Sequence, residues 1–378
     1  MINIYVAIII HSNNLLRLSV TQQTENKNGL NVLLVKHTSL GDLIHALPAL
    51  TDAQKALPNI SFDWSINENF AEIATWHPVV DKIITNDHRK WRKELFKSIK
   101  SGELKQFYKS LRAKTYDYVI DGQTNFKSAI TAKLARSKNK CGYDKSTCAE
   151  PIAHLGYNRK YHIDKNLHAV ERLRMLFAEA LGYDKPNTPP DFGIDSSKFV
   201  QPTINLPTKY LLFIHNASWV TKLWPEEYWI KTTQLATKAG YNILLPSGNK
   251  SELERAQRIA NTSDNAIALP LMKLSELAFI ISKAQAAVCV DTGLSHLTAA
   301  LNIPSITLYG ATDSGLIGAV GNSQEHLQST FHCAPCYLKK CQYADEVKKY
   351  PVMPPCFEEL SPELIWQRLT SKMDDQSL

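Results

Sequence analysis

Long hydrophobic runs are missing from this sequence of 378 residues. No segment reaches the roughly 20 apolar residues that a helix needs to cross a bilayer. The apolar run at residues 2–10 is short, and it has neither a basic stretch before it nor a small-residue cleavage site after it, so it is a poor secretory signal. We therefore expect no transmembrane segment, and we expect residues 1–30 to form an extension outside the fold.

Three cofactor and metal signatures are also missing. No Gly-x-Gly-x-x-Gly follows a strand candidate, which disfavours a nicotinamide or flavin enzyme, and no Gly-x-x-x-x-Gly-Lys-Ser/Thr is present, which disfavours a P-loop ATPase. No Asp-x-Asp stands at the end of a strand candidate, so the Mg²⁺ clamp of many single-domain sugar transferases is missing as well. The sequence predicts no obligatory cofactor and no metal in the site.

Cysteine is uncommon, and its seven residues are an odd number. An odd count in a large chain without an export signal is typical of the reducing cytoplasm. Cys333, Cys336 and Cys341, with Cys356 further on, have part of the spacing of a metal site. Zinc or an iron–sulfur centre is therefore an alternative, but we expect reduced structural thiols in an irregular, proline-rich surface loop.

The rest of the composition is that of a globular α/β protein. Hydrophobic residues make up 44% and charged residues 21% of a chain that is long enough for two domains. Short apolar runs without strict alternation are typical of strands buried on both faces of a parallel sheet, and helical patterns lie between them. The expected strands are residues 32–35, 62–66, 118–120, 210–214, 242–245, 287–290 and 305–308, and the expected helices are 43–56, 128–134, 168–181, 225–238, 252–260, 274–284 and 294–301.

This alternation predicts two doubly wound, Rossmann-like domains made of right-handed βαβ units. A proline-rich stretch with few apolar residues interrupts it, and we take residues 186–207 as the linker. The linker separates an N-terminal domain at 31–185 from a C-terminal domain at 208–345. Residues 346–378 contain a final helix, which we expect to pack back toward the N-terminal domain. The site should lie in the cleft between the domains.

A polar loop ending in Gly41 separates the first expected strand from the first helix, and Asp42 stands where that helix begins. A carboxylate at this position can cap the helix by accepting from free N–H groups, and the local sequence alone favours that role. It can also act as a general base on an attacking hydroxyl, since ligands of such sheets bind beyond the carboxyl ends of the strands.

A second loop, Asp291-Thr292-Gly293, follows a buried strand and opens a helix. The free N–H groups and the positive end of that helix suit a diphosphate. His296 in the first turn is either a phosphate donor or a packed core histidine. Ser218 and Lys222 lie in another loop between a strand and a helix, where Lys222 is a candidate phosphate cation, although a lone loop lysine is usually only exposed.

The formal net charge is +7, and the excess is unevenly spread. Six cations lie between residues 89 and 100, against Glu94 alone. Such a basic face suits an anionic partner, whether nucleic acid, phospholipid headgroups or a phosphorylated glycolipid. A solvated helix face explains this segment equally well.

Together these motifs resemble the bacterial lipopolysaccharide heptosyltransferases, most closely the type that adds the first heptose. The resemblance runs from about Asn31 to the last expected helix, and the order and spacing of its segments are more specific than any one of them. The segments are 36–42 with 47–53, 91–93, 121–123 with 127–129, 222–227, 291–300 and 309–313.

The resemblance implies the GT-B architecture, in which two Rossmann-like domains face each other across a cleft. It implies transfer of L-glycero-D-manno-heptose from ADP-heptose to the first Kdo of Kdo2-lipid A, with inversion, by a cytoplasmic protein that is peripheral on the inner membrane. By the family pattern Asp42 is the catalytic base. The family pattern also makes Ser218, Lys222, Glu252, Met272, Asp291, Thr292, Gly293 and His296 donor-binding residues, and we assign Lys36, Arg89, Lys90, Arg92, Lys93 and Lys127 to acceptor binding.

Two departures from the family pattern, and two other classes of protein, provide alternatives to this interpretation. Ala217 stands where the family often has a hydroxyl residue, and the cysteine cluster is commoner in sister enzymes, which keeps an enzyme adding the second heptose open. A nucleotide-sugar epimerase should need a dinucleotide glycine loop, which the sequence lacks. Nucleic-acid binding through residues 89–100 would not account for the predicted diphosphate site at Asp291-Thr292-Gly293, so we expect no nucleic-acid partner.

Overall fold

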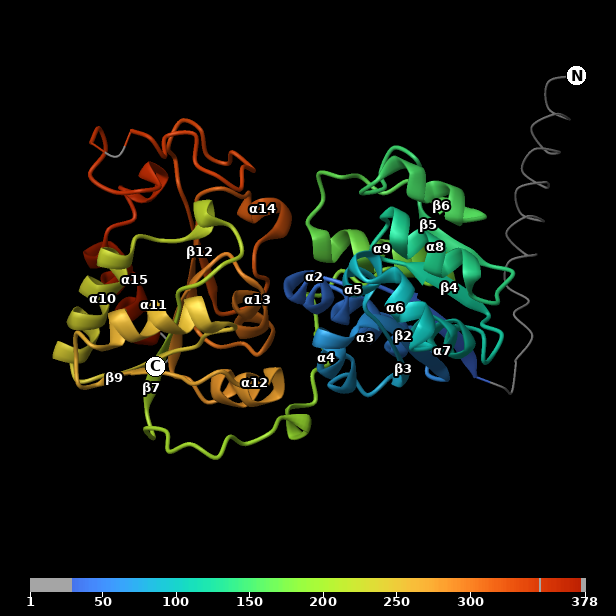
Figure 1. Cartoon of the computed structure of the whole chain (residues 1–378), viewed down its shortest axis with the longest axis horizontal. Helices are drawn as coiled ribbons and strands as arrows, with labels where there is room; N and C mark the ends of the chain where they lie inside the picture. The colour runs from blue at the N-terminus through green and yellow to red at the C-terminus, as the bar shows by residue number, and fades with distance from the viewer. Residues whose placement is uncertain (1–28, 347, 375–378) are drawn as a thin grey trace, which may run out of the picture.

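The computed structural model describes residues 29–346 and 348–374, which form two α/β domains (Figure 1). The first contains a parallel six-stranded sheet in the order β3-β2-β1-β4-β5-β6. Of the predicted extension only residues 29 and 30 are described, and Leu30 already begins the first strand, so the fold starts one residue earlier than expected. The strands are β1 (Leu30–Val35), β2 (Ile60–Asn67), β3 (Val80–Asn86), β4 (Tyr118–Asp121), β5 (Lys140–Tyr143) and β6 (Arg159–Tyr161).

The second domain repeats this plan with a parallel sheet in the order β12-β11-β10-β7-β8-β9. Every residue is buried in three of its four interior strands, β7, β10 and β11, as expected where helices cover both faces. Two parallel, doubly wound sheets confirm the predicted fold class. The strands are β7 (Tyr210–Ile214), β8 (Asn242–Leu245), β9 (Ala266–Ala268), β10 (Ala286–Val290), β11 (Ser305–Tyr309) and β12 (Gln324–Gln328).

Helices lie on both faces of each sheet. Those of the first domain are α2 (Leu40–Ile44), α3 (Leu47–Ala56), α4 (Ala71–Thr75), α5 (His88–Lys93), α6 (Leu95–Lys100), α7 (Glu103–Leu111), α8 (Phe126–Leu134) and α9 (Ala169–Leu181). Those of the second are α10 (Glu226–Lys238), α11 (Lys250–Ala260), α12 (Leu274–Ser282), α13 (Gly293–Ala300), α14 (Ser314–Ile317) and α15 (Pro362–Asp374). No helix of the described residues is long and apolar enough to cross a membrane.

Local sequence explains where three helices begin and end. The single helix expected at 43–56 is two helices, because Pro48 has no backbone N–H to donate to the carbonyl of Ile44, four residues earlier, where α2 ends. Pro225 is the N-cap of α10, whereas the expected helix at 225–238 made it the first helical residue. Gly182 follows the last residue of α9 as its C-cap with a left-handed φ of 77°, a conformation that glycine adopts without strain.

Strands that the sequence did not reveal lie mainly at the edges. The strands β3, β6, β9 and β12 are the four edge strands of the two sheets, and none has a continuous buried run. An edge strand is partly solvated, so it lacks the apolar signal of a central strand. The fifth missed strand, β5, has only four residues.

Residues 186–207 connect the domains with a single helical turn, Ser196–Lys198. The backbone N–H of Asp195 donates to the Trp76 carbonyl at 2.8 Å, and the ring of Phe199 meets that of Trp76 edge-on at 5.2 Å. The linker is therefore packed against the first domain. Figure 1 shows it passing from one domain to the other.

The last helix corrects a prediction. Helix α15 packs against α10 and against β10 and β11, all of the second domain, and Figure 1 shows it beside α10. Ile365 and Leu369, one turn apart, are fully buried in the core of that domain, and the Trp366 ring meets the Tyr241 ring at 5.7 Å. The apolar stripe thus covers the second sheet and does not return to the first domain.

Candidate active site between the two domains

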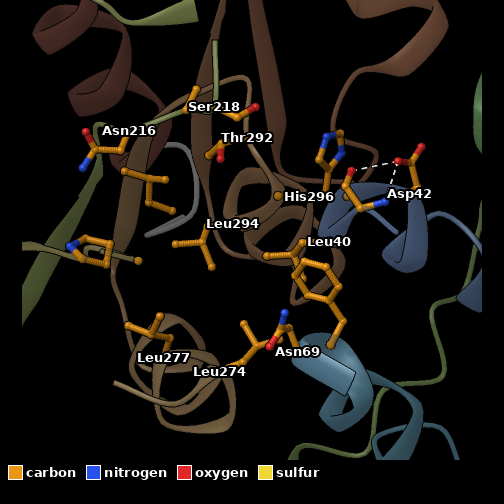
Figure 2. A pocket seen from close by; sticks show the side chains of 18 of the residues that line it. Leu40, Asp42, Asn69, Asn216, Ser218, Leu274, Leu277, Thr292, Leu294 and His296 are labelled. Carbon is orange, nitrogen blue, oxygen red and sulfur yellow. Dashed lines mark hydrogen bonds between the residues drawn. The ribbon is translucent and has the colours of Figure 1, made fainter. Parts of the chain in front are cut away.

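A cavity of about 750 Å³ lies between the domains, beyond the carboxyl ends of strands from both sheets. Doubly wound sheets bind ligands at this edge. Figure 2 shows Asp42 on the first-domain wall, with Ser218 and Thr292 across the space and His296 beside the helix that carries Asp42. The lining includes all nine residues predicted as catalytic or donor-binding: Asp42, Ser218, Lys222, Glu252, Met272, Asp291, Thr292, Gly293 and His296.

Asp42 is the third residue of α2, and Ser39 is the N-cap. The expectation that Asp42 is the N-cap is therefore wrong, because the cap lies three residues earlier, at Ser39. Asp42 Oδ2 accepts hydrogen bonds from the backbone N–H and the hydroxyl of Ser39, both at 2.8 Å. Among the described residues no hydrogen bond involves Oδ1. The carboxylate is thus oriented by one oxygen and retains the other as a proton acceptor.

Asp291 is the most connected group of the cavity. Its Oδ2 accepts from Lys222 Nζ at 2.7 Å and from Thr312 Oγ1 at 2.5 Å, and its Oδ1 lies 3.8 Å from His296 Nε2. The residue is only 3% exposed. Burial opposes ionisation, but contact with His296 and the charge of Lys222 outweigh it and hold the pKa of Asp291 well below its ordinary value. Asp291 therefore stays ionised and orients Lys222 at the cavity.

A histidine pair joins the domains at this point. His45 Nε2, at the end of α2, lies 3.0 Å from His296 Nδ1 on α13, and both rings are buried. Burial and the neighbouring imidazoles of His296 and His168 lower the pKa of His45 well below its ordinary value. Because His45 is neutral, one of the two rings can donate a hydrogen bond to the other without repulsion between two positive charges.

Two glycines let α2 and α13 approach closely. A Cβ atom on Gly41 would lie 2.5 Å from His296 Cδ2, and one on Gly293 would lie 2.5 Å from Leu40 Cβ. Real Cβ atoms essentially never come so near, so each helix has a glycine where the other presents a side chain. This reciprocal packing brings the helix that carries Asp42 against the Asp291-Thr292-Gly293 loop.

The remaining predicted donor residues form the opposite wall. Thr292 caps α13, and the loop before α11 is held by Glu252, whose carboxylate accepts from Gly248 N at 2.8 Å and from Asn249 Nδ2 at 2.7 Å. Helix α11 thus begins next to the cavity with Glu252 in its first turn.

The residues predicted to bind the acceptor lie elsewhere, and none of the six lines the cavity. Lys36 is buried, and its Nζ donates to the Gly122 carbonyl at 3.0 Å. Burial lowers the pKa of Lys36, while the carboxylates of Asp42 and Asp121 oppose that shift. Lys36 is placed to act on these carboxylates and not on an acceptor directly. Arg89, Lys90, Arg92 and Lys93 lie on α5 and Lys127 on α8; of these, Lys90 is paired with Glu103 at 2.8 Å.

The cysteine cluster forms a separate small cavity in the second domain. Cys333, Cys336, Cys341 and Cys356 all line it, and all are free thiols. Burial, together with the neighbouring cysteines, raises the pKa of Cys356 to about 12, so this thiol is protonated at neutral pH. Within residues 29–346 and 348–374, no group of three or more His, Cys, Asp or Glu side chains is arranged to hold a metal ion.

Some cavity residues escaped the sequence analysis. Glu68, Asn69 and Glu72 line the first-domain wall after β2. Their position after a buried strand was a usable signal, since the carboxyl ends of β1 and β2 lie side by side. His45 had no such signal, because its role depends on contact with His296 of the other domain.

Comparison with known proteins agrees with this geometry. A family model described as glycosyltransferase family 9 (heptosyltransferase) matches residues 104–346. Lipopolysaccharide heptosyltransferase 1 of Pseudomonas aeruginosa is 42% identical over 350 residues, 91% of this chain and 98% of that protein. The same enzyme of Escherichia coli K12 is 47% identical over 298 residues, 78% of this chain and 92% of that protein.

A solved structure gives the same result at the level of the fold. The E. coli heptosyltransferase WaaC with ADP superimposes with a TM-score of 0.79 at 41% identity, covering 91% of this chain and all of that one. Since the family model spans more than half of the chain and these relatives match it over most of their length, the chain belongs to glycosyltransferase family 9, the heptosyltransferases.

Proposed function

We propose that this chain transfers L-glycero-D-manno-heptose from ADP-heptose to the first Kdo of Kdo2-lipid A, with inversion, at the cytoplasmic face of the inner membrane. The observation that carries the proposal is the cavity in which Asp42 faces the Asp291–His296 loop, with Lys222 held between that loop and open space. The relatives are named as heptosyltransferase 1, and the matching WaaC structure holds ADP, which supports an adenine nucleotide donor and the first heptose.

In the proposed reaction Asp42 takes the proton of the acceptor hydroxyl as its oxygen attacks the anomeric carbon of the heptose. Ser39 holds Oδ2 through two hydrogen bonds, so Oδ1 is the oxygen that receives the proton. A base held in place in this way contributes about 100- to 10,000-fold to a reaction rate.

The bond from the heptose to the diphosphate breaks as the new bond forms, and negative charge collects on the departing ADP. Lys222 and the N-terminal turn of α13 are positioned to offset that charge. Asp291 keeps Lys222 oriented before the donor arrives, and His296, held by His45, completes this wall. The close approach of the two domains at Gly41 and Gly293 would help to exclude water, which competes with the acceptor hydroxyl for the donor sugar.

The test measures ADP release and product mass with ADP-heptose and either Kdo2-lipid A or the acceptor that already carries one heptose. Wild type should act on the first acceptor, and Asp42→Ala should lose at least about 100-fold in rate. Asp264→Ala is the matched control, since Asp264 is exposed on the second domain and does not line the cavity.

Near-normal turnover of Asp42→Ala would remove Asp42 as the base. Activity on the heptosylated acceptor alone would assign the chain to addition of the second heptose. Donor consumption without any acceptor, at an unchanged rate, would contradict glycosyl transfer.

A further inference from the structure

Exposed apolar side chains gather on one part of the first domain. Of the fourteen large hydrophobic side chains that stand exposed on the described residues, eight belong to α6, α7, α8 and the 3₁₀ turn Pro151–Gly156. Phe96 is 88% exposed and Leu155 64%. We call this surface the α6–α8 face, and its apolar members are Phe96, Ile99, Tyr108, Phe126, Ile130, Leu134, Ile152 and Leu155.

These elements are in contact with one another. Helix α6 packs on α7, and α8 packs on the 3₁₀ turn. Arg112, at the end of α7, donates to the Leu134 carbonyl of α8 at 2.7 Å and stacks over the Tyr108 ring at 5.2 Å. The Thr131 hydroxyl of α8 meets His88 of α5 at 3.5 Å. The apolar residues therefore lie on contiguous elements, and Figure 1 shows α7 and α8 on the side of this domain remote from the second domain.

The same segment carries the net charge of the chain. Residues 88–134 contain twelve Lys and Arg against four Asp and Glu, a net charge of +8, while the whole chain carries +7. Of the four acids, Asp121 is fully buried and Glu103 is paired with Lys90. The cations of α5 to α8 thus lie on the same or contacting helices as exposed apolar side chains that no other part of the described chain covers.

Cationic side chains around protruding Phe, Ile and Leu match an anionic bilayer, where apolar groups enter the headgroup region and Lys and Arg meet lipid phosphates. Nucleic acid matches less well, because five of the eight apolar residues are aliphatic and offer no ring on which a base can stack. We propose that the α6–α8 face docks this protein on the surface of an anionic phospholipid bilayer.

The position of this face gives docking a consequence for the site, which rests on the proposed function. The His88 ring on α5 meets the His37 ring at 4.8 Å, and the backbone N–H groups of His37 and Thr38 donate to Gln123 Oε1, just before α8, at 3.0 and 3.1 Å. Helix α5, which packs against α6, and Gln123, which precedes α8, thus contact the loop that leads to Asp42 and lie next to the α6–α8 face. A lipid-anchored acceptor would reach that loop from the bilayer while its acyl chains stay in the membrane.

Vesicle co-sedimentation of the full chain tests docking without any substrate. The vesicles contain phosphatidylcholine alone, or phosphatidylcholine with roughly 30% of the anionic lipid phosphatidylglycerol. Wild type should bind the anionic vesicles, bind the zwitterionic ones much more weakly, and be released by salt. Lys100→Glu with Lys105→Glu should weaken binding at least about 25-fold, since each cation is worth about fivefold. Phe96→Ser with Ile99→Ser should weaken it at least about tenfold.

Matched controls lie on other surfaces. Val200→Ser with Ile267→Ser replaces two exposed apolar residues away from the face, and Lys231→Glu with Lys238→Glu makes the same charge change on α10. Both controls should bind like wild type. Circular dichroism and thermal unfolding verify that every variant is folded.

Three results would overturn docking: no binding of wild type to anionic vesicles, equal binding of the face variants and wild type, or equal losses in the controls. Self-association in sedimentation velocity that Phe96→Ser with Ile99→Ser abolishes, without vesicle binding, would instead assign the face to a second copy of the chain.

Activity assays separate this inference from the proposed function. With a detergent-dispersed acceptor the Phe96→Ser with Ile99→Ser variant should retain wild-type activity, and with the acceptor in vesicles it should lose at least about tenfold. Lost activity in both assays would contradict a docking role, and an inactive wild type that still binds vesicles would refute the proposed function alone.

Discussion

The contact between α2 and α13 makes the activity of this enzyme sensitive to one methyl group. Gly293→Ala places a Cβ atom 2.5 Å from the Cβ of Leu40, whereas ordinary contacts of such atoms begin at 3.4 Å. The two helices must therefore move apart by about 1 Å, which misplaces Asp42 relative to the Asp291-Thr292-Gly293 loop and is expected to lower kcat/KM by about 100-fold.

Two effects on stability oppose each other in this variant. Alanine is a better helix former than glycine by up to about 1 kcal/mol, and Gly293 has no left-handed φ that would strain an alanine. Overpacking costs about 1–3 kcal/mol, and separation of the domains relieves part of it. We therefore expect a change in the free energy of unfolding of at most about 2 kcal/mol, beside the large loss of activity.

The assay is steady-state ADP release, with donor affinity from calorimetry and unfolding in urea. Gly315→Ala is the matched control, since its new atom would lie 3.1 Å from Asp313 Oδ1, the end of a side chain that can yield. Leu40→Gly in the Gly293→Ala chain removes the contacting atom and should restore part of the rate. If Gly293→Ala keeps kcat/KM within about threefold of wild type, far from the loss expected of a 1 Å displacement, the close approach is not needed for catalysis.

Three further variants test the charges and histidines of the interior. Lys222→Met leaves the buried carboxylate of Asp291 without its cation, so we expect a loss of about 3 kcal/mol in the free energy of unfolding in urea, and weaker donor binding in calorimetry. Burial lowers the pKa of His77 to about 4 in the folded chain, so the unfolded chain takes up this proton first as the pH falls. The contribution of this histidine to the free energy of unfolding should therefore be fully present above about pH 6.5. It should decline toward pH 4 by up to about 1.4 kcal/mol per pH unit, and His77→Gln should lessen that decline. Arg174→Met removes the cation that contacts the buried Asp52 at 2.6 Å, and urea unfolding should show a loss of about 3–5 kcal/mol.

Conservative variants provide the controls. Lys222→Arg and Arg174→Lys keep the cation. Each should lose less than half of the stability that the corresponding Met variant loses. Equal losses in Met and conservative variants would mean that packing, and not charge, explains the effect. An unchanged pH dependence in His77→Gln would show that this histidine titrates alike in the folded and unfolded chains.

The central strands and the order of the donor motifs could be predicted from the sequence. Strands β7 and β10 are continuous runs of buried apolar residues, and β1 is one over residues 32–35, so the sequence alone predicts them as strands buried on both faces. The loops after such strands carry the ligand chemistry, so position and residue type made Asp42, Lys222 and Asp291 candidates, and the family resemblance supplied the roles predicted for them. Edge strands and the short helices α4 to α7 gave no comparable signal, because solvent covers part of them.

The role of a residue could not be predicted where it depends on a partner that is remote in the chain. Lys36 looked like an acceptor cation, but the fold buries it against the Gly122 carbonyl. Helix α15 has an apolar stripe that either sheet could cover, and only packing assigns it to the second. Local periodicity thus determined the buried strands and the motif loops, since these depend on neighbours in the chain. The tertiary structure alone decided that His45 meets His296 and that Gly41 and Gly293 bring the two domains together, because close packing depends on atoms from both.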